Sequence, residues 1–272
     1  MTDFWNQVLS FAETTNLRIG NQLLKDFGNV HAEEKADGSL VTKSDKWADR
    51  EIREAIANTF PTHGVLTEET QHIFPNNEWC WIIDPLDATT NFARGIPIWG
   101  TSMGLLYQGT PVFGYVHLPP LHQSYYGFYY QKNQINLTHP PIIRAFLNHR
   151  PIHPIQDEIT GNHLFNLCSR STYILPQLPT KIRMLGMASY NFLLVACGAS
   201  IGGVEATPRI WDIVASWVIA KAAGAAWVPL QSGDIFPLKV GKNYLNYPFP
   251  TLCVGNQKLV SIFLPSVEPL RK

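Results

Sequence analysis

The chain has 272 residues, of which 45% are hydrophobic and 15% are charged, and its 21 basic and 21 acidic side chains cancel. This length suits one large domain or two closely packed ones, with enough apolar material for a core. The balanced charge provides no basic face, so we do not expect binding to a nucleic-acid backbone. No apolar run reaches the roughly 20 residues that span a bilayer, so we expect no membrane partner.

Cysteine usage and the first residues indicate a compartment. The four cysteines are scattered without Cys-x-x-Cys spacing, which predicts buried free thiols in a reducing environment. The first residues lack the charged start and apolar stretch of a signal peptide. We therefore expect a cytoplasmic protein. The nine histidines show no zinc-binding spacing.

Two helices are predicted at the start of the chain. Apolar side chains recur at helical spacing within residues 3–27, beginning with Trp5. A second helix is expected to follow Asp45 and to stop at Pro61.

The most informative segment is an apolar run that ends in two aspartates, at residues 79–92. A strand at residues 81–83 would carry Asp84 to its end, where Pro85 stops the pairing because it has no N–H to donate. Asp87 returns to the same place, and the residues after it can open a helix whose free N–H groups bind an anion. Hard oxygen ligands beside such a site fit Mg²⁺ and a phosphate ester. The alternative is an ordinary Asp-Pro turn in which Asp87 caps a helix.

Other acids lie at the ends of predicted elements. A short apolar strand runs into Glu68 and Glu69, although neighbouring side chains on a strand point to opposite faces. Asp212 opens a strongly apolar helix, and Asp45 opens the second helix. Carboxylates placed in this way can converge on one cleft.

The remainder of the chain predicts layered α and β structure. Residues 101–107, 112–118 and 124–131 resemble strands, with a hairpin turn between the first two. Residues 137–156 are rich in proline and histidine, which predicts an exposed connection between an N-terminal half, 1–140, and a C-terminal half, 141–272. The second half alternates strands and helices, and Gly224 is the expected end of the Asp212 helix. Its predicted elements are residues 163–168, 187–197, 203–205, 212–223 and 251–255.

These segments together resemble the inositol monophosphatase family of the Mg²⁺-dependent, lithium-sensitive phosphatase superfamily. The family motif Asp-Pro-(Ile/Leu)-Asp-Gly-Thr-x-Asn-Phe matches residues 84–92 with one departure, and its Trp-Asp-x-Ala-Ala segment matches residues 211–225 loosely. The Glu-Glu pair and the Leu-Val-Thr-x-x-Asp segment match residues 68–69 and 40–45. The resemblance implies an α+β fold, a layered α-β-α-β-α sandwich of the inositol monophosphatase and fructose-1,6-bisphosphatase type, with the active site between the two halves.

The resemblance also implies metal ligands. Glu68, Asp84 and the Leu86 carbonyl would hold one Mg²⁺ ion, and Asp84, Asp87 and Asp212 would hold a second. Without cations such carboxylates would repel one another by roughly 4 kcal/mol per pair at 4 Å and an effective dielectric constant near 20. Two or three Mg²⁺ ions would reverse that cost.

Further residues match catalytic and substrate positions of the family. Glu68 and Asp45 would help to place a third ion or its waters, and Thr89 would hydrogen-bond the nucleophilic water. The N–H groups of Ala88 and Thr89 would bind the phosphate. Substrate contacts are also implied for Ala188, Glu205 and Asp212, although without the resemblance Glu205 could equally be a surface acid.

Some positions depart from the family pattern. Ala88 stands where the family has glycine, and we expect it to have a negative φ because it should begin a helix. Thr67 replaces a glycine, and residues 131–134 lack a glycine-rich turn. None of these departures removes a proposed metal ligand, so the chain is identified as a divergent member.

We predict a Mg²⁺-dependent phosphomonoesterase that hydrolyses a small polyol or sugar phosphate with a metal-activated water. Histidinol phosphate and fructose 1,6-bisphosphate are alternative substrates for the same chemistry. The alternative class is a non-catalytic relative that binds metal or phosphate. The expected partner is a small phosphate ester, and the resemblance by itself implies a homodimer.

Overall fold

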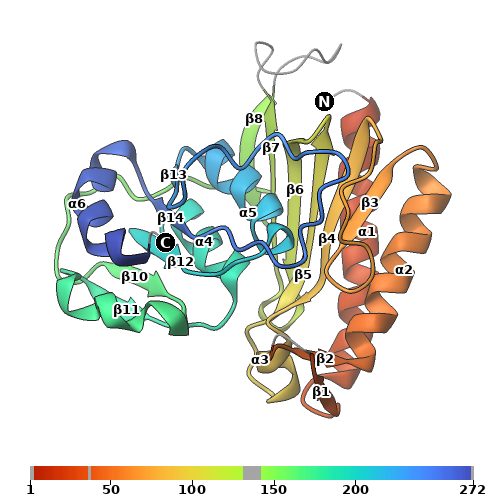
Figure 1. The fold of residues 1–272 in the computed structure, drawn as a ribbon, viewed down its shortest axis with the longest axis horizontal. Helices are drawn as coiled ribbons and strands as arrows, with labels where there is room; N and C mark the ends of the chain where they lie inside the picture. Colours follow the sequence, from red (N-terminus) through yellow and green to blue (C-terminus); the bar gives the residue numbers. More distant parts are fainter. Residues whose placement is uncertain (1–2, 36–37, 131–141, 271–272) are drawn as a thin grey trace.

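The computed structural model of the chain describes residues 3–35, 38–130 and 142–270. Within these residues it has two main sheets and six α-helices arranged in five layers, α-β-α-β-α (Figure 1). Helices α1 and α2 cover one face of the large sheet, α4 and α5 lie between the two sheets, and α6 covers the outer face of the small sheet. The predicted α+β sandwich is therefore confirmed. The α-helices are α1 (Asp3–Asp26), α2 (Lys43–Thr59), α3 (Thr89–Ala93), α4 (Ala188–Ala196), α5 (Ile210–Ala223) and α6 (Gln257–Val267).

The large sheet has the order β3-β4-β5-β6-β7-β8-β9 in the described part of the chain. Its strands are β3 (Gly64–Thr67), β4 (Trp79–Asp87), β5 (Gly100–Tyr107), β6 (Thr110–Leu118), β7 (Gln123–Tyr130), β8 (Ile142–Leu147) and β9 (Arg150–Pro151). Strands β3 and β4 are parallel, and the other neighbouring pairs are antiparallel. The predicted hairpin turn between β5 and β6 is present, and its two residues, Gln108 and Gly109, both have positive φ.

The small sheet has the order β11-β10-β12-β14-β13, and a further short ribbon pairs β1 with β2. These strands are β1 (Ala32–Glu34), β2 (Leu40–Thr42), β10 (Leu164–Leu167), β11 (Lys181–Arg183), β12 (Gly202–Glu205), β13 (Ala226–Pro229) and β14 (Thr251–Val254). Most elements predicted for the second half are thereby confirmed. Gly224 ends α5 in the left-handed conformation, as expected.

The prediction of an exposed connection at residues 137–156 is wrong in one respect: its central part forms strands, although most of its residues are exposed or half-buried. Residues 142–151 form β8 and β9, and β8 pairs along its whole length with β7. Ile142, Phe146 and Leu147 of β8 pack against the core, and none of the prolines that suggested a loop lies within β8, while Pro151 is part of β9. Residues 137–141 lie outside the described residues. The large sheet thus extends to Pro151, while the division at residue 140 stays a prediction.

Two other predictions concern cysteines and membranes. All four cysteines are free thiols, with Cys80 and Cys253 buried and Cys168 and Cys197 half-buried. Among the described residues, no helix combines the length and apolar character that a membrane crossing requires.

Helix α5 approaches the large sheet at backbone distance because neighbouring strands have glycine beneath it. A Cβ atom added at Gly104 would collide with Val214, one at Gly114 would collide with the backbone of Ala215, and one at Gly127 would lie 3.1 Å from the Ile219 Cα. The helix is apolar all round, as expected of a helix covered by sheets on both sides. This packing determines where its first turn, which carries Asp212, lies relative to β4.

The glycine contact gives a testable consequence for stability. Gly114→Ala should lower the free energy of unfolding by about 1–3 kcal/mol, because the new methyl group would overlap a backbone that has no room to move. Gly161→Ala is the matched control, since nothing lies within 4 Å of its added Cβ. Chemical denaturation of both variants measures the difference. Equal stabilities would contradict the packing described here.

Candidate active site

Strand β4 delivers two carboxylates to one place by means of a β-bulge. Asp84 pairs with Ser102 and Asp87 pairs with Gly100, so three steps on β4 oppose two steps on β5. In a regular strand, residues three apart point to opposite faces. The extra residue of the bulge brings both side chains to the same side. The expectation that Pro85 stops the pairing is therefore wrong, because β4 continues through the bulge to Asp87.

Asp212 completes a cluster of three acids. It lies in the first turn of α5, where its Oδ2 accepts a hydrogen bond of 2.6 Å from the Arg209 N–H. Asp84, Asp87 and Asp212 each have a carboxylate oxygen within 4.8 Å of one in the other two. Asp84 and Asp87 are buried. In the described part of the chain this group of oxygen donors could hold a metal ion.

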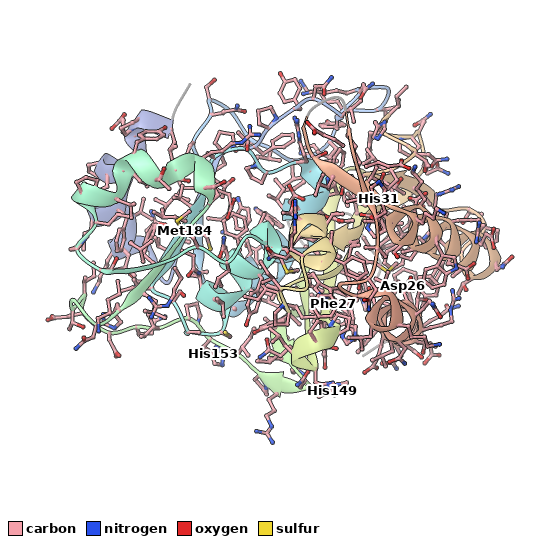
Figure 2. The ribbon with its side chains drawn as sticks, turned by 90° about the horizontal axis from the view of Figure 1, so that it is seen from below. Asp26, Phe27, His31, His149, His153 and Met184 are labelled. Atoms are coloured by element: carbon pink, nitrogen blue, oxygen red, sulfur yellow. The ribbon has the colours of Figure 1, made fainter. Side chains whose placement is uncertain are left out.

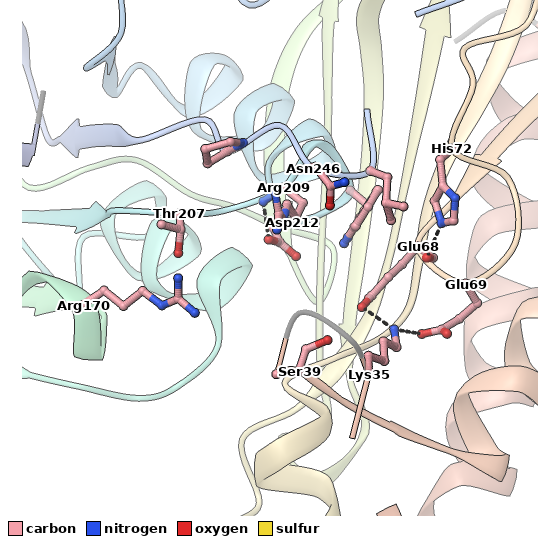
Figure 3. Close-up of a pocket in the computed structure, with 14 residues that line it drawn as sticks. Lys35, Ser39, Glu68, Glu69, His72, Arg170, Thr207, Arg209, Asp212 and Asn246 are labelled. Atoms are coloured by element: carbon pink, nitrogen blue, oxygen red, sulfur yellow. Dashed lines mark hydrogen bonds and ion pairs between the residues drawn. The ribbon is translucent and has the colours of Figure 1, made fainter. Parts of the chain in front are cut away.

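Glu68 lies beside this cluster but has a cationic partner of its own. The Lys35 Nζ is 2.9 Å from Glu68 Oε1 and 2.7 Å from Glu69 Oε1 (Figure 3). Strand β3 ends at Thr67, so the alternation of side chains does not extend to the two glutamates, and both turn toward the same ammonium group. Burial by itself would lower the pKa of Lys35, but Glu68 and Glu69 raise it above its usual range.

Asp45 and Thr89 form a buried pair behind the acids. The Thr89 hydroxyl donates to Asp45 Oδ1 at 2.9 Å and also lies 3.1 Å from the Leu86 carbonyl. The second oxygen of Asp45 accepts the Thr42 N–H at 2.7 Å, and the Thr42 hydroxyl accepts in return from the first turn of α2. This capping box explains why α2 begins here and why Asp45 points inward.

The expectation of a negative φ at Ala88 is wrong. Ala88 has φ = 71° and lies immediately before α3, which begins at Thr89. Ala88 is therefore the N-cap residue of α3 and does not belong to its first turn, so it does not have to adopt the negative φ of a helical residue. A left-handed residue is needed where the chain turns sharply from β4 into α3, and alanine adopts that conformation at a cost.

The residues expected on the substrate side border one cavity. Ala188, at the start of α4, and Glu205, at the end of β12, line a space of about 390 Å³ together with Asp87 and Asp212. The Asn191 Nδ2 donates to Glu205 Oε1 at 2.5 Å. Glu205 is buried, so it is not the surface acid that the sequence left open. The remaining lining residues are Leu167, Cys168, Ser169, Met184, Gly186 and Met187.

A larger cavity of about 750 Å³ also borders Asp212 (Figure 3). Glu68 and Lys35 line one wall, and Arg170 lies across the opening near Thr207. Sequence reasoning missed Lys35 and Thr207, which lie in connecting segments, and Arg170, which lies at the start of a 3-10 helix (Ser169–Gln177) that has no recognisable sequence pattern.

Most histidines lie away from the acids. Figure 2 shows His149 and His153 at the periphery of the molecule. His117 is buried and its ring contacts the Ser124 hydroxyl, while His139 lies outside the described residues. His72 lines the larger cavity, where its ring nitrogen is 2.8 Å from the Glu68 carbonyl oxygen.

Burial and mutual repulsion raise the pKa values of the acids. Burial is the main cause at Asp84 and Asp212, and the negative charges of neighbouring acids add to it, so the pKa of each lies well above its usual range. The same causes raise the pKa of Glu68 to about 7, despite the nearby Lys35. Burial beside Asp87 also raises the pKa of Glu205 to about 7. Metal-free, the site therefore retains protons that a bound cation would displace.

Comparisons with known proteins agree with this geometry. A family model described as the inositol monophosphatase family matches residues 5–249. A fructose-1,6-bisphosphatase/inositol-1-monophosphatase of Aquifex aeolicus is 30% identical over 87% of this chain and 96% of the relative. An inositol-1-monophosphatase of Synechocystis is 32% identical over 79% of this chain and 76% of the relative.

Other relatives have different names or a solved structure. The Nus factor SuhB of Salmonella typhimurium is 26% identical over 96% of both chains. The solved structure of an IMPase from Thermotoga maritima superposes with a TM-score of 0.79 at 25% identity, covering 96% of this chain and 98% of that one.

The left-handed Ala88 predicts a stabilising substitution. Ala88→Gly should raise the free energy of unfolding by about 1 kcal/mol, because glycine adopts positive φ without a steric penalty. Ala93→Gly, in the last position of α3, is the control and should lower stability by about 0.5–1 kcal/mol. A loss of stability in both variants on denaturant titration would contradict the conformation of Ala88.

The raised carboxyl pKa values predict how the metal-free protein responds to pH. An acid whose pKa is raised by folding adds most to the free energy of unfolding below its ordinary pKa. That contribution is lost as the pH rises through the pKa of the acid in the folded protein. Since the pKa of Glu205 rises from 4.5 to about 7, the Tm in EDTA should fall across that interval. Glu205→Gln should make the fall shallower, and saturating Mg²⁺ should oppose it because the metal binds the deprotonated acids. A Tm that rises from pH 4.5 to 7 in EDTA would show that these groups are not perturbed as described.

Proposed function

The chain belongs to the inositol monophosphatase family, and from this we propose that it is a Mg²⁺-dependent phosphomonoesterase that hydrolyses a small polyol or sugar phosphate. The observation that carries the proposal is the cluster of Asp84, Asp87 and Asp212 beside a cavity of about 390 Å³. Such a volume lies within the usual range of small-molecule sites.

The donor atoms suit Mg²⁺. The three clustered ligands are carboxylate oxygens, and hard oxygen donors favour Mg²⁺ over metals that select nitrogen or sulfur. Asp84, Asp87 and Asp212 would hold one ion, and Glu68 and Asp84 with the Leu86 carbonyl would hold another. When bound, Mg²⁺ supplies neutralising charge and lowers the pKa of water. Lys35 contacts only Oε1 of Glu68, so the second carboxylate oxygen of Glu68 would be the one available to a metal ion.

Thr89 and Asp45 are proposed to orient the attacking water. Because the Thr89 hydroxyl donates its proton to Asp45, its lone pairs remain able to accept a hydrogen bond from water. Asp45 is held by the α2 capping box and can take up the proton that Thr89 passes on. Glu68 would contact the same water, or the waters of a third ion, from the opposite wall.

Phosphate and alcohol would lie on opposite sides of the acids. The N–H groups of Ala88 and Thr89, before and at the start of α3, would bind the phosphate. Ala188 and Glu205 would face the alcohol. The carboxylates of Glu205 and Asp212 can accept hydrogen bonds from its hydroxyl groups. Among the described residues that line this smaller cavity there is no lysine or arginine, which favours an uncharged polyol or sugar there.

A bisphosphate is the second candidate substrate, and Arg170 is the observation that favours it. Its side chain is exposed and lies across the larger cavity from the acids, where it could bind a second phosphate. The Aquifex aeolicus relative has fructose-1,6-bisphosphatase in its name. Histidinol phosphate stays an alternative that the cavity lining does not distinguish.

A binding role without catalysis is the alternative class. Relatives called Nus factor SuhB show that not every name in the comparison is that of a phosphatase. The presence of Glu68, Thr89 and all three clustered acids argues for an active enzyme, because hydrolysis requires these groups. Lithium inhibition, a homodimer and an active site between halves 1–140 and 141–272 belong to the same proposal and rest on the family resemblance. A cytoplasmic location also belongs to it and rests on the cysteine usage of the chain.

Phosphate release from a panel of monoesters tests the proposal. We expect turnover of inositol 1-phosphate or a sugar phosphate with Mg²⁺ and none with EDTA, and we expect Asp87→Asn to lower the rate at least about 100-fold. Asp234→Asn, an exposed acid outside both cavities, is the matched control and should behave as wild type.

Thermal melts separate metal binding from catalysis. Mg²⁺ should raise the Tm of the wild type and of Asp234→Asn but raise that of Asp87→Asn much less. Equal shifts in all three proteins would reject Asp87 as a ligand. A normal Mg²⁺ shift without turnover of any ester would instead indicate the binding role.

A further inference from the structure

The three clustered acids are held in place in two different ways. One oxygen of Asp84 accepts the Leu86 N–H at 3.0 Å, and one oxygen of Asp212 accepts the Arg209 N–H at 2.6 Å. Both donors lie within three residues of the acid, so these two carboxylates are oriented by their own turns. Asp87 accepts from the backbone of Ala88 next to it, and in addition from Ser189, which lies 102 residues further along the chain.

Ser189 contacts Asp87 through two donors. Its N–H is 3.1 Å and its hydroxyl 2.5 Å from the same oxygen, Oδ2 of Asp87. Ser189 is completely buried, so water does not compete for these contacts. Hydrogen bonds to a carboxylate are stronger than those between neutral groups, and two on one oxygen restrict rotation of the carboxylate plane.

Ser189 is itself held rigidly because it lies in the first turn of α4. Two residues later, Asn191 is joined to β12 through Glu205 and to β10 through Asn166, whose Nδ2 donates to the Asn191 carbonyl at 2.8 Å. Helix α4 also packs against α5, which carries Asp212. The contact with Ser189 therefore fixes Asp87 relative to α4, the helix that borders the smaller cavity.

We propose that Ser189 is a positioning residue whose hydroxyl orients Asp87 for metal binding. This inference rests on the proposed function, because it takes Asp87 as a Mg²⁺ ligand. The hydroxyl fixes a carboxylate that comes from one side of the site against a helix that comes from the other. Loss of the hydroxyl would leave Asp87 held by backbone N–H groups alone, those of Ser189, Ala188 and Ala88, without the short side-chain contact that ties the carboxylate to α4.

The test compares Ser189→Ala with Ser189→Thr by titration of the metal-free full-length protein with Mg²⁺ in a calorimeter. Groups that orient metal ligands typically change metal affinity by about 10–100-fold, so we expect the Mg²⁺ dissociation constant of Ser189→Ala to rise about tenfold. Ser189→Thr keeps the hydroxyl and should stay within about threefold of wild type. The Tm of each variant in EDTA reports whether the fold is intact.

Ser216→Ala is the matched control. Ser216 is also completely buried in a helix, but its hydroxyl donates to the backbone carbonyl groups of Asp212 and Ile213 and not to the carboxylate of Asp212 or of any other acid. Its Mg²⁺ dissociation constant should equal that of wild type. In active enzyme, Ser189→Ala should require more Mg²⁺ for half-maximal kcat, while its KM for the ester at saturating Mg²⁺ stays near the wild-type value.

Three outcomes would decide against Ser189. The inference is wrong if Ser189→Ala binds Mg²⁺ as tightly as wild type, or if Ala and Thr variants weaken binding equally and both lose stability in EDTA. It also fails, together with the proposed function, if wild type binds no Mg²⁺. If wild type binds Mg²⁺ but hydrolyses no ester, the proposed function fails and the calorimetric comparison still decides the role of Ser189.

Discussion

Close packing of helix α5 on the large sheet is the constraint on which the site depends. Gly104, Gly114 and Gly127 leave room for the helix backbone, and any side chain there would move the helix outward. Because Asp212 lies in the first turn of this helix, its distance from Asp84 and Asp87 follows from the packing. Apolar burial along the helix thus holds a carboxylate where electrostatics alone would not place it.

The electrostatic cost of that arrangement is the physical basis of the proposed function. Two unit charges 4 Å apart repel by roughly 4 kcal/mol at an effective dielectric constant near 20, and burial adds a desolvation penalty. The raised pKa values of Asp84 and Asp212 express this cost, since protonation relieves it. Lys35 offsets part of the charge at Glu68 and Glu69. The three clustered acids could hold a metal ion, whose positive charge would offset this repulsion.

Sequence reasoning succeeded where a local pattern carries the information. Helical spacing of apolar residues located α1 and α2, and the Asp-Pro-Leu-Asp segment identified the turn with two acids. It failed where the outcome depends on a neighbouring strand. The bulge between Asp84 and Asp87 is defined by the partner β5, and β8 is recognised as a strand through its pairing with β7. The left-handed Ala88 follows from the angle between β4 and α3, which no single residue reveals.

The sequence by itself determined the family, most of the element types and the identity of the candidate ligands, because these depend on residue chemistry and on local patterns along the chain. The tertiary structure decided how the ligands are oriented. Lys35 reaches the two glutamates from a separate ribbon, and Ser189 reaches Asp87 from a helix 102 residues away. Such contacts depend on how sheets and helices stack, and the stacking is set by the shape and volume of the whole core, so it is not encoded in any one segment.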